Sequence, residues 1–168
     1  MSETSAAKAT IEITRSNFKE VVERDGIVLL DWWAPWCGPC RVFGPTYEKV
    51  AGKNRDAMFG KINTEEQQEL AGAFGIQSIP TLMILRDRVL LYSQPGAILE
   101  SALEDLLAQA RGLDMDKVRA EVAEQEKQRA HDHAGHDHGH GHDHAGHDHG
   151  HDHAGHDQGQ GDGPGKRS

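Results

Sequence analysis

The sequence has little cysteine and, over most of its length, no histidine. Only two of its 168 residues are cysteine, and all 12 histidines lie at or after residue 131. The first 130 residues therefore lack the third and fourth ligands that a closed zinc site needs. In a reducing compartment, two cysteines three positions apart favour catalysis or metal binding over a structural cross-link.

Long apolar runs and a basic, apolar start are also missing. The longest apolar run, 27–34, is interrupted by Asp31, and the segment Met1–Ser5 carries no positive charge ahead of an apolar stretch. We therefore expect neither a membrane span nor an export signal, and a cytoplasmic location. The formal net charge of -9 argues against nucleic acid as a partner. We expect a monomer.

Composition divides the chain into three parts. Residues 1–112 hold nearly all of the apolar side chains and predict one compact domain. Residues 113–130 predict a charged helical extension, solvated or loosely docked. Residues 131–168 repeat the unit His-Asp-His-Ala-Gly-His-Asp-His and cannot build a core, so we expect a disordered His/Asp/Gly tail.

Within the first part, strand and helix patterns alternate and then give a hairpin, which predicts an α/β fold. Strands are expected at 11–13, 27–33, 57–63, 81–85 and 89–92, and helices at 16–26, 41–51, 64–75 and 98–110. The nearly continuous apolar run of 27–33 is typical of a central strand. We expect Pro45 to kink its helix, and Thr64 with Gln67 to form a capping box.

The chemistry is predicted to centre on Cys37 and Cys40. At the first turn of a helix the pair can close a disulfide with little chain movement, and unpaired backbone N–H groups there favour a thiolate at Cys37. Cys40 lies further inside the helix, so we expect it to be more shielded and to resolve a mixed disulfide formed at Cys37. Pro39 restricts the loop, whereas Gly38 lets a substrate backbone come close. A zinc knuckle and a pair of inert buried thiols are the alternatives.

The segment Asp31-Trp32-Trp33-Ala34-Pro35-Trp36-Cys37-Gly38-Pro39-Cys40 resembles the active-site segment of the thioredoxin family. Ile79-Pro80-Thr81 is similar to the cis-proline loop of that family, and the resemblance covers about residues 11–112. It implies a thioredoxin fold, with a central mixed β-sheet flanked by helices on both faces. It also implies the reduction of protein disulfides, with no cofactor bound in the core.

The resemblance further implies roles for single residues. Asp31 would act through water as the base that deprotonates Cys40, and Lys61 would tune that carboxylate. Pro80 would follow a cis bond and leave the backbone of Ile79 free to pair with substrate. Trp36 would form the rim of the substrate groove, with Gly96 after the last strand. The plainer readings are a turn-capping Asp31, a strand-edge Lys61 and a strand-start Pro80.

Partners follow from the same resemblance: disulfide-containing protein substrates and a flavin-dependent, NADPH-using thioredoxin reductase. The sequence departs from the family pattern at Arg41, Trp32 and Arg86-Asp87-Arg88, where lysine, phenylalanine and a Gly-containing turn are common. These changes leave the preferred partners open.

The tail offers imidazoles interleaved with carboxylates, which suit Zn, Ni or Cu ions. Its histidines are His131, His133, His136, His138, His140, His142, His144, His147, His149, His151, His153 and His156. A metal-buffering or metal-delivery protein is therefore an alternative function, as is a thioredoxin-like co-chaperone adaptor. A merely solubilising extension is the plainest interpretation of the tail.

Overall fold

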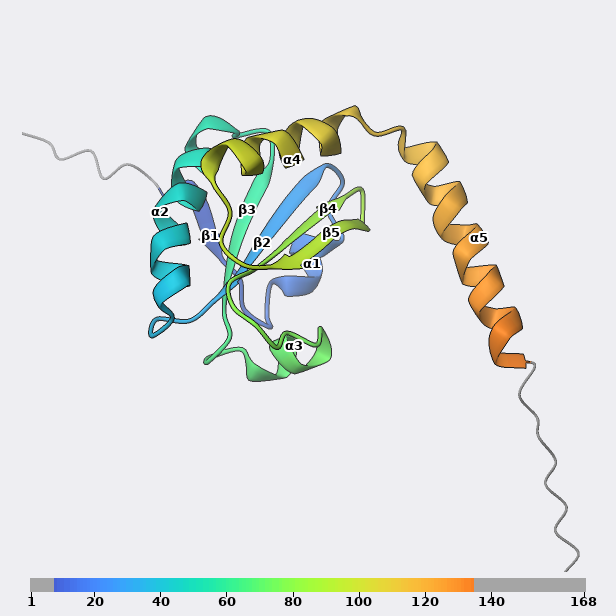
Figure 1. Ribbon diagram of the computed structural model, residues 1–168, viewed down its shortest axis with the longest axis horizontal. Helices are drawn as coiled ribbons and strands as arrows, with labels where there is room; N and C mark the ends of the chain where they lie inside the picture. Colours follow the sequence, from blue (N-terminus) through green and yellow to red (C-terminus); the bar gives the residue numbers. More distant parts are fainter. Residues whose placement is uncertain (1–7, 135–168) are drawn as a thin grey trace, which may run out of the picture.

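The computed structural model describes residues 8–134, which form ten elements (Figure 1). In chain order they are β1 (Thr10–Glu12), α1 (Phe18–Val22), β2 (Ile27–Trp33), α2 (Gly38–Lys53), β3 (Met58–Asn63), α3 (Gln68–Ala73), β4 (Thr81–Arg86), β5 (Val89–Pro95), α4 (Glu100–Gly112) and α5 (Met115–Ala134).

The five strands form one mixed sheet in the order β1-β3-β2-β4-β5. β1, β3 and β2 run parallel, whereas β4 and β5 pair antiparallel. Every residue of β2 except the half-buried Trp33 is buried, which confirms the central strand predicted from its apolar run. The mixed sheet and its flanking helices confirm the predicted fold class.

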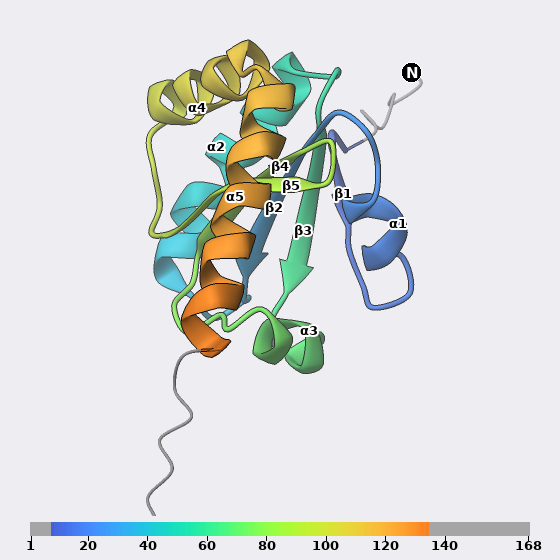
Figure 2. The ribbon, with the colours of Figure 1, turned by 90° about the vertical axis from the view of Figure 1, so that its right-hand side faces the viewer.

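Helices cover both faces of the sheet, and each face has its own apolar core (Figures 1 and 2). On one face Leu29 packs with residues of α2 and α4, such as Tyr47 and Leu107. On the other face Trp32 packs with residues of α1 and α3, such as Phe18. Because side chains alternate along a strand, Asp31 points to the same face as Leu29, beneath α2.

The predicted capping box of Thr64 and Gln67 is wrong. The Thr64 hydroxyl instead donates to the carbonyl of Trp33, at 3.1 Å. The amide oxygen of Gln67 accepts from the backbone N–H of Arg15, at 3.0 Å, and α3 begins only at Gln68 with no side-chain cap. Thr64 and Gln67 therefore bond to residues distant in the chain instead of to each other.

The hairpin between β4 and β5 forms as predicted, but its turn has only two residues and no glycine. Asp87 and Arg88 both adopt positive φ, at 49° and 72°. The turn is held to the start of β2, because the Asp87 carboxylate accepts from the Gly26 N–H at 2.7 Å and the Asp87 N–H donates to the Gly26 carbonyl at 3.0 Å. Aspartate tolerates this left-handed backbone better than most residues.

Several further bounds differ from the predictions; α1, for example, spans Phe18–Val22 rather than 16–26. β1 begins at Thr10, and Ile11 is 37% exposed, so it is an edge residue. α2 begins at Gly38, three residues before the predicted start, and runs through Pro45. α5 is helical as predicted but continues to Ala134, past the predicted end at residue 130 and into the predicted tail.

α5 is a solvated helix. Met115 is buried and Val118 half-buried, but every side chain from Arg119 to His131 is exposed. The helix follows α4. The Arg86 guanidinium donates to the Ala110 carbonyl at the end of α4, at 2.6 Å, and to the carbonyl of Leu113 just after it, at 2.9 Å. The remaining predicted tail, 135–168, lies outside the described residues.

Candidate redox site

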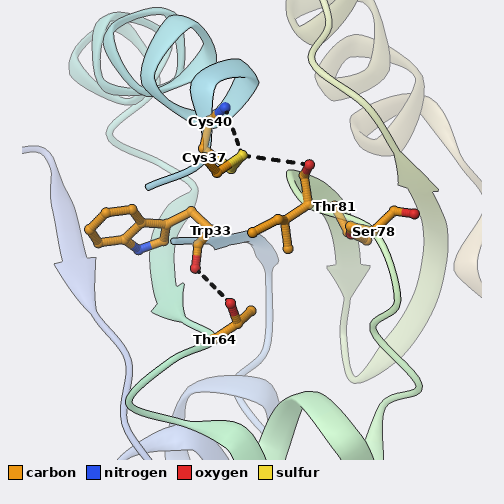
Figure 3. Close-up of a disulfide and its surroundings, with 7 residues drawn as sticks. Trp33, Cys37, Cys40, Thr64, Ser78 and Thr81 are labelled. Carbon is orange, nitrogen blue, oxygen red and sulfur yellow. Dashed lines mark hydrogen bonds between the residues drawn. A yellow bond between two sulfur atoms is a disulfide. The ribbon is translucent and has the colours of Figure 1, made fainter. Parts of the chain in front are cut away.

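The two cysteines lie at the start of α2 and form a disulfide (Figure 3). Cys37 is the N-cap of the helix, and its sulfur accepts from the backbone N–H of Cys40 at 3.2 Å. Their Cα atoms are 5.3 Å apart. The spacing predicted such a closure, and the alternative of two inert thiols is excluded by the bond between them.

Both cysteines are equally shielded in this oxidised state, each 4% exposed. The expectation that Cys40 is more shielded than Cys37 is therefore not met. The reason is that Cys37, although it caps the helix, is covered by its own neighbours: Ala34, Trp33 and Ile79 pack against the pair.

The loop before β4 faces Cys37. The Cys37 sulfur lies 3.7 Å from the carbonyl oxygen of Ile79. The Ile79–Pro80 peptide bond is cis, which confirms what the resemblance implied. The Gly96 N–H donates to the Pro80 carbonyl at 2.7 Å, with Gly96 at a φ of 107° that favours glycine. Gly96 therefore fixes the loop from β5.

Ile79 lies next to the sheet without belonging to it. The ladders of β4 with β2 and with β5 both begin at Thr81, whose hydroxyl donates to the carbonyl of Ser78. An extended chain could therefore pair with the backbone at Ile79. Trp36, the residue before Cys37, is 67% exposed.

Asp31, in the central strand β2, is only 1% exposed. Neither of its carboxylate oxygens has a hydrogen-bond partner among the described residues. Burial raises the pKa of Asp31 to about 7, against the opposing effect of the Lys61 charge. The predicted burial is confirmed, and a turn-capping role is excluded because Asp31 lies within β2.

Lys61 is paired with Asp31 in the register of β2 and β3. Its ammonium nitrogen lies 4.7 Å from the centroid of the Trp33 ring, a cation–π contact. Lys61 is half-buried and stands in an interior strand of the sheet, so it is not the edge lysine of the plainer reading.

The sequence reasoning treated Tyr47 only as a core residue and missed its place near the site. It is fully buried, and its hydroxyl donates to the carbonyl of Gly60 at 2.8 Å. Burial and the neighbouring Asp31 charge raise the pKa of Tyr47 well above its usual value. A tyrosine among the apolar positions of 41–51 was the available signal, since a buried hydroxyl needs a partner.

Glu48, one residue on, was also missed. Its carboxylate accepts from the Thr10 hydroxyl at 2.6 Å and from the Ala9 N–H at 2.9 Å. Burial works against ionisation, but these hydrogen bonds and the Lys61 charge lower the pKa of Glu48 below its usual value. Glu48 thus ties α2 to the edge strand β1.

The described part of the chain contains neither grouped metal ligands nor a helix able to span a membrane. Between residues 8 and 134 no three His, Cys, Asp or Glu side chains are grouped so as to hold a metal ion. Of the tail histidines predicted as ligands, those from His136 onward lie outside the described residues, and the side chain of His131 is exposed. No described helix has both the length and the apolar character to cross a membrane.

Comparison with known proteins agrees with this geometry. Residues 9–109 match the thioredoxin family model. The chain is 58% identical over 120 residues to a protein of Streptomyces coelicolor named putative thioredoxin 2, covering 71% of this chain and 90% of that one. It is 39% identical to a thioredoxin of Alicyclobacillus acidocaldarius over 104 residues, 59% of this chain and 99% of that protein.

Solved structures give the same result. A mutant thioredoxin of Halobacterium salinarum superposes with a TM-score of 0.58 at 31% identity, covering 66% of this chain and 98% of that one. The Malassezia sympodialis thioredoxin gives a TM-score of 0.54, also at 31% identity, over 60% and 89% of the two chains.

The fold and its cysteine pair define a thiol-disulfide oxidoreductase with protein disulfide reductase activity. The chain belongs to the thioredoxin family. Proteins of this family generally reduce disulfide substrates and are themselves reduced by thioredoxin reductase. Their core domain uses a redox-active disulfide and needs no bound cofactor.

Proposed function

We propose that the reduced protein attacks a substrate disulfide with the thiolate of Cys37. One sulfur of the substrate leaves as a thiol and the other is held in a mixed disulfide with Cys37. The Cys40 thiolate then attacks the Cys37 sulfur, releases the second substrate thiol and closes the Cys37–Cys40 bond. Two electrons and two protons pass from the dithiol to the substrate. The observation that carries this assignment is the position of Cys37 at the N-cap, facing Ile79.

Asp31 is proposed as the base that takes the proton of Cys40, through water. Its pKa of about 7 suits a proton acceptor near neutral pH, and its unpartnered oxygens leave it free to accept. Lys61 is the proposed positioning residue, because its charge is the one that favours the ionised form of Asp31.

The substrate is proposed to bind as an extended chain along Ile79, between Trp36 and the turn at Gly96. The backbone of Ile79 stands at the start of a ladder, and Gly38 adds no side chain that would block approach to Cys37. Pro39, at the first turn of α2, has no backbone N–H and so cannot donate a hydrogen bond to the substrate backbone.

We place the reaction in the cytosol, where an NADPH-dependent thioredoxin reductase would return the disulfide to the dithiol. This setting supports reduction, because glutathione and thioredoxin systems keep cytosolic thiols reduced. The location is tested by imaging a fluorescent fusion of the protein in cells. The recycling partner is tested by mixing the purified, oxidised chain with purified bacterial thioredoxin reductase and NADPH, which should reduce it.

Insulin reduction driven by dithiothreitol tests the activity itself. The intact chain should accelerate the precipitation of insulin chains, and the Cys37→Ser variant should not. If the folded intact chain shows no acceleration, the reductase assignment fails and an adaptor or co-chaperone role gains weight.

A second proposed function is metal binding by the tail, supported by its 12 histidines and interleaved aspartates. The intact chain should bind zinc at pH 7.5 and release it below about pH 5.5, because protonated imidazole is no ligand. A full-length variant with all 12 histidines changed to asparagine is the matched control. Equal zinc uptake by both proteins would contradict the proposal.

A further inference from the structure

A concave surface adjoins the disulfide at Cys40. It is a groove of about 780 Å³ between α2 and the segment that leads into β1. Cys40 and Trp33 line the end nearest the disulfide. The groove reaches Cys40 and Lys61, but no step of the reaction described above places substrate in it.

The groove is lined by four cationic side chains: Lys8, Arg41, Arg55 and Lys61. None of them makes a salt bridge within the part of the chain that the structure describes, whereas nine other lysine and arginine side chains there do. Unpaired cations are thus gathered in one place on a protein whose formal net charge is -9.

The single carboxylate in the lining, Glu48, offsets only one of the four positive charges. Its oxygens accept from the Thr10 hydroxyl and the Ala9 N–H, and the Lys61 charge also favours its ionised form. Gly44 of α2 lies close to Lys61, since a Cβ at Gly44 would be in ordinary contact with the Lys61 nitrogen, at 3.9 Å. Both residues line the groove.

We propose that this basic groove, defined by Lys8, Arg41, Arg55 and Lys61, binds an acidic segment of the disulfide-bearing substrate protein. The inference rests on the proposed reductase function and names a preference among its substrates. Charge complementarity argues for an anionic occupant. Continuity argues for the substrate, because Cys40 lines the groove and forms the disulfide with Cys37, which faces the Ile79 edge.

Three synthetic peptides test the preference. Each carries the same small disulfide loop and a flexible extension that ends in four aspartates, four serines or four lysines. The pre-reduced full chain is mixed with each peptide, and the second-order rate constant is followed by tryptophan fluorescence. We expect the aspartate peptide to react about fivefold faster than the serine peptide, as several exposed ion pairs would give. The lysine peptide should react no faster than the serine peptide, and 0.5 M salt should remove most of the difference.

Two full-length double variants locate the effect. Arg41→Gln with Arg55→Gln should bring the ratio of the aspartate rate to the serine rate close to one. Lys127→Gln with Arg129→Gln removes two cations on α5 that also lack a described salt bridge, and it should leave that ratio unchanged. A ratio that falls equally in both variants would overturn the assignment to the groove.

Other outcomes are also decisive. Equal rates for all three peptides with the wild-type chain overturn the proposal while the reductase function stands. A third result is that all peptides react equally with the wild-type chain and that the Arg41→Gln, Arg55→Gln double variant reacts faster with every one of them. The chain's own aspartate-rich tail would then occupy the groove, and the proposal would again be overturned. If no peptide is reduced, the proposed function itself has failed.

Discussion

Asp31 and Lys61 occupy paired positions on the parallel strands β2 and β3, yet no hydrogen bond joins them. The two carboxylate oxygens of Asp31 are buried without a partner among the described residues, and the Lys61 ammonium lies against the Trp33 ring. A buried carboxyl group that is left unpaired holds its proton more tightly than usual. The folded state therefore disfavours ionisation of Asp31.

The first prediction concerns the stability of Asp31→Asn. The folded-state pKa of Asp31, about 7, lies above its ordinary value of 3.8, so the folded state binds this proton more tightly. The contribution of Asp31 to the free energy of unfolding must therefore fall as the pH rises from about 4 through 7. The stability of Asp31→Asn relative to wild type should increase by about 2 to 3 kcal/mol between pH 5 and pH 8.

Urea denaturation of both proteins at the two pH values measures this difference. Because the comparison is between variant and wild type, the titration of other carboxylates cancels. A stability difference that is the same at pH 5 and pH 8 would show that Asp31 ionises normally.

The second prediction concerns Lys61→Met. The Lys61 charge opposes the effect of burial, so its removal should move the pKa of Asp31 above about 7. Carbon NMR titration of the Asp31 carboxyl group gives the midpoint directly. Lys49→Met is a suitable control, because Lys49 pairs with Glu100 on α4 and should leave the midpoint where it is. An unchanged or lower midpoint in Lys61→Met would remove Lys61 from its proposed role.

The third prediction concerns Tyr47→Phe. Loss of the hydroxyl leaves the Gly60 carbonyl without its buried donor, which should lower the free energy of unfolding by about 1 to 3 kcal/mol. Tyr92→Phe makes the same chemical change at a half-buried position on β5 and should cost less than about 0.5 kcal/mol. Equal losses in the two variants would mean that the Tyr47 hydroxyl bond contributes nothing.

Local patterns predicted most of the fold. Three features depend only on residues close together in the chain, and the structure has each as predicted: the central strand β2, the hairpin of β4 and β5, and the disulfide between Cys37 and Cys40. The capping box failed because a distant carbonyl, that of Trp33, was the better partner for Thr64. Local signals cannot reveal a competitor of that kind.

The arrangement around Asp31 needed the structure. The resemblance named Asp31 and Lys61, but their pairing follows from the register of two strands about 30 residues apart in the chain, which the alternation of side chains alone does not fix. Tyr47 and Glu48 lie in one turn of α2, and only the helix's placement over β3 and β1 shows what their polar atoms contact.

The measurement that most directly tests the division of labour between the cysteines is the trapping of a mixed disulfide. Reduced Cys40→Ser and Cys37→Ser variants are mixed with a peptide disulfide, quenched with acid and weighed by intact mass spectrometry. The Cys40→Ser variant should carry one peptide, attached at Cys37, whereas Cys37→Ser should remain unmodified. A peptide trapped on Cys40 as fast as on Cys37 would contradict the assignment of Cys37 as the attacking residue.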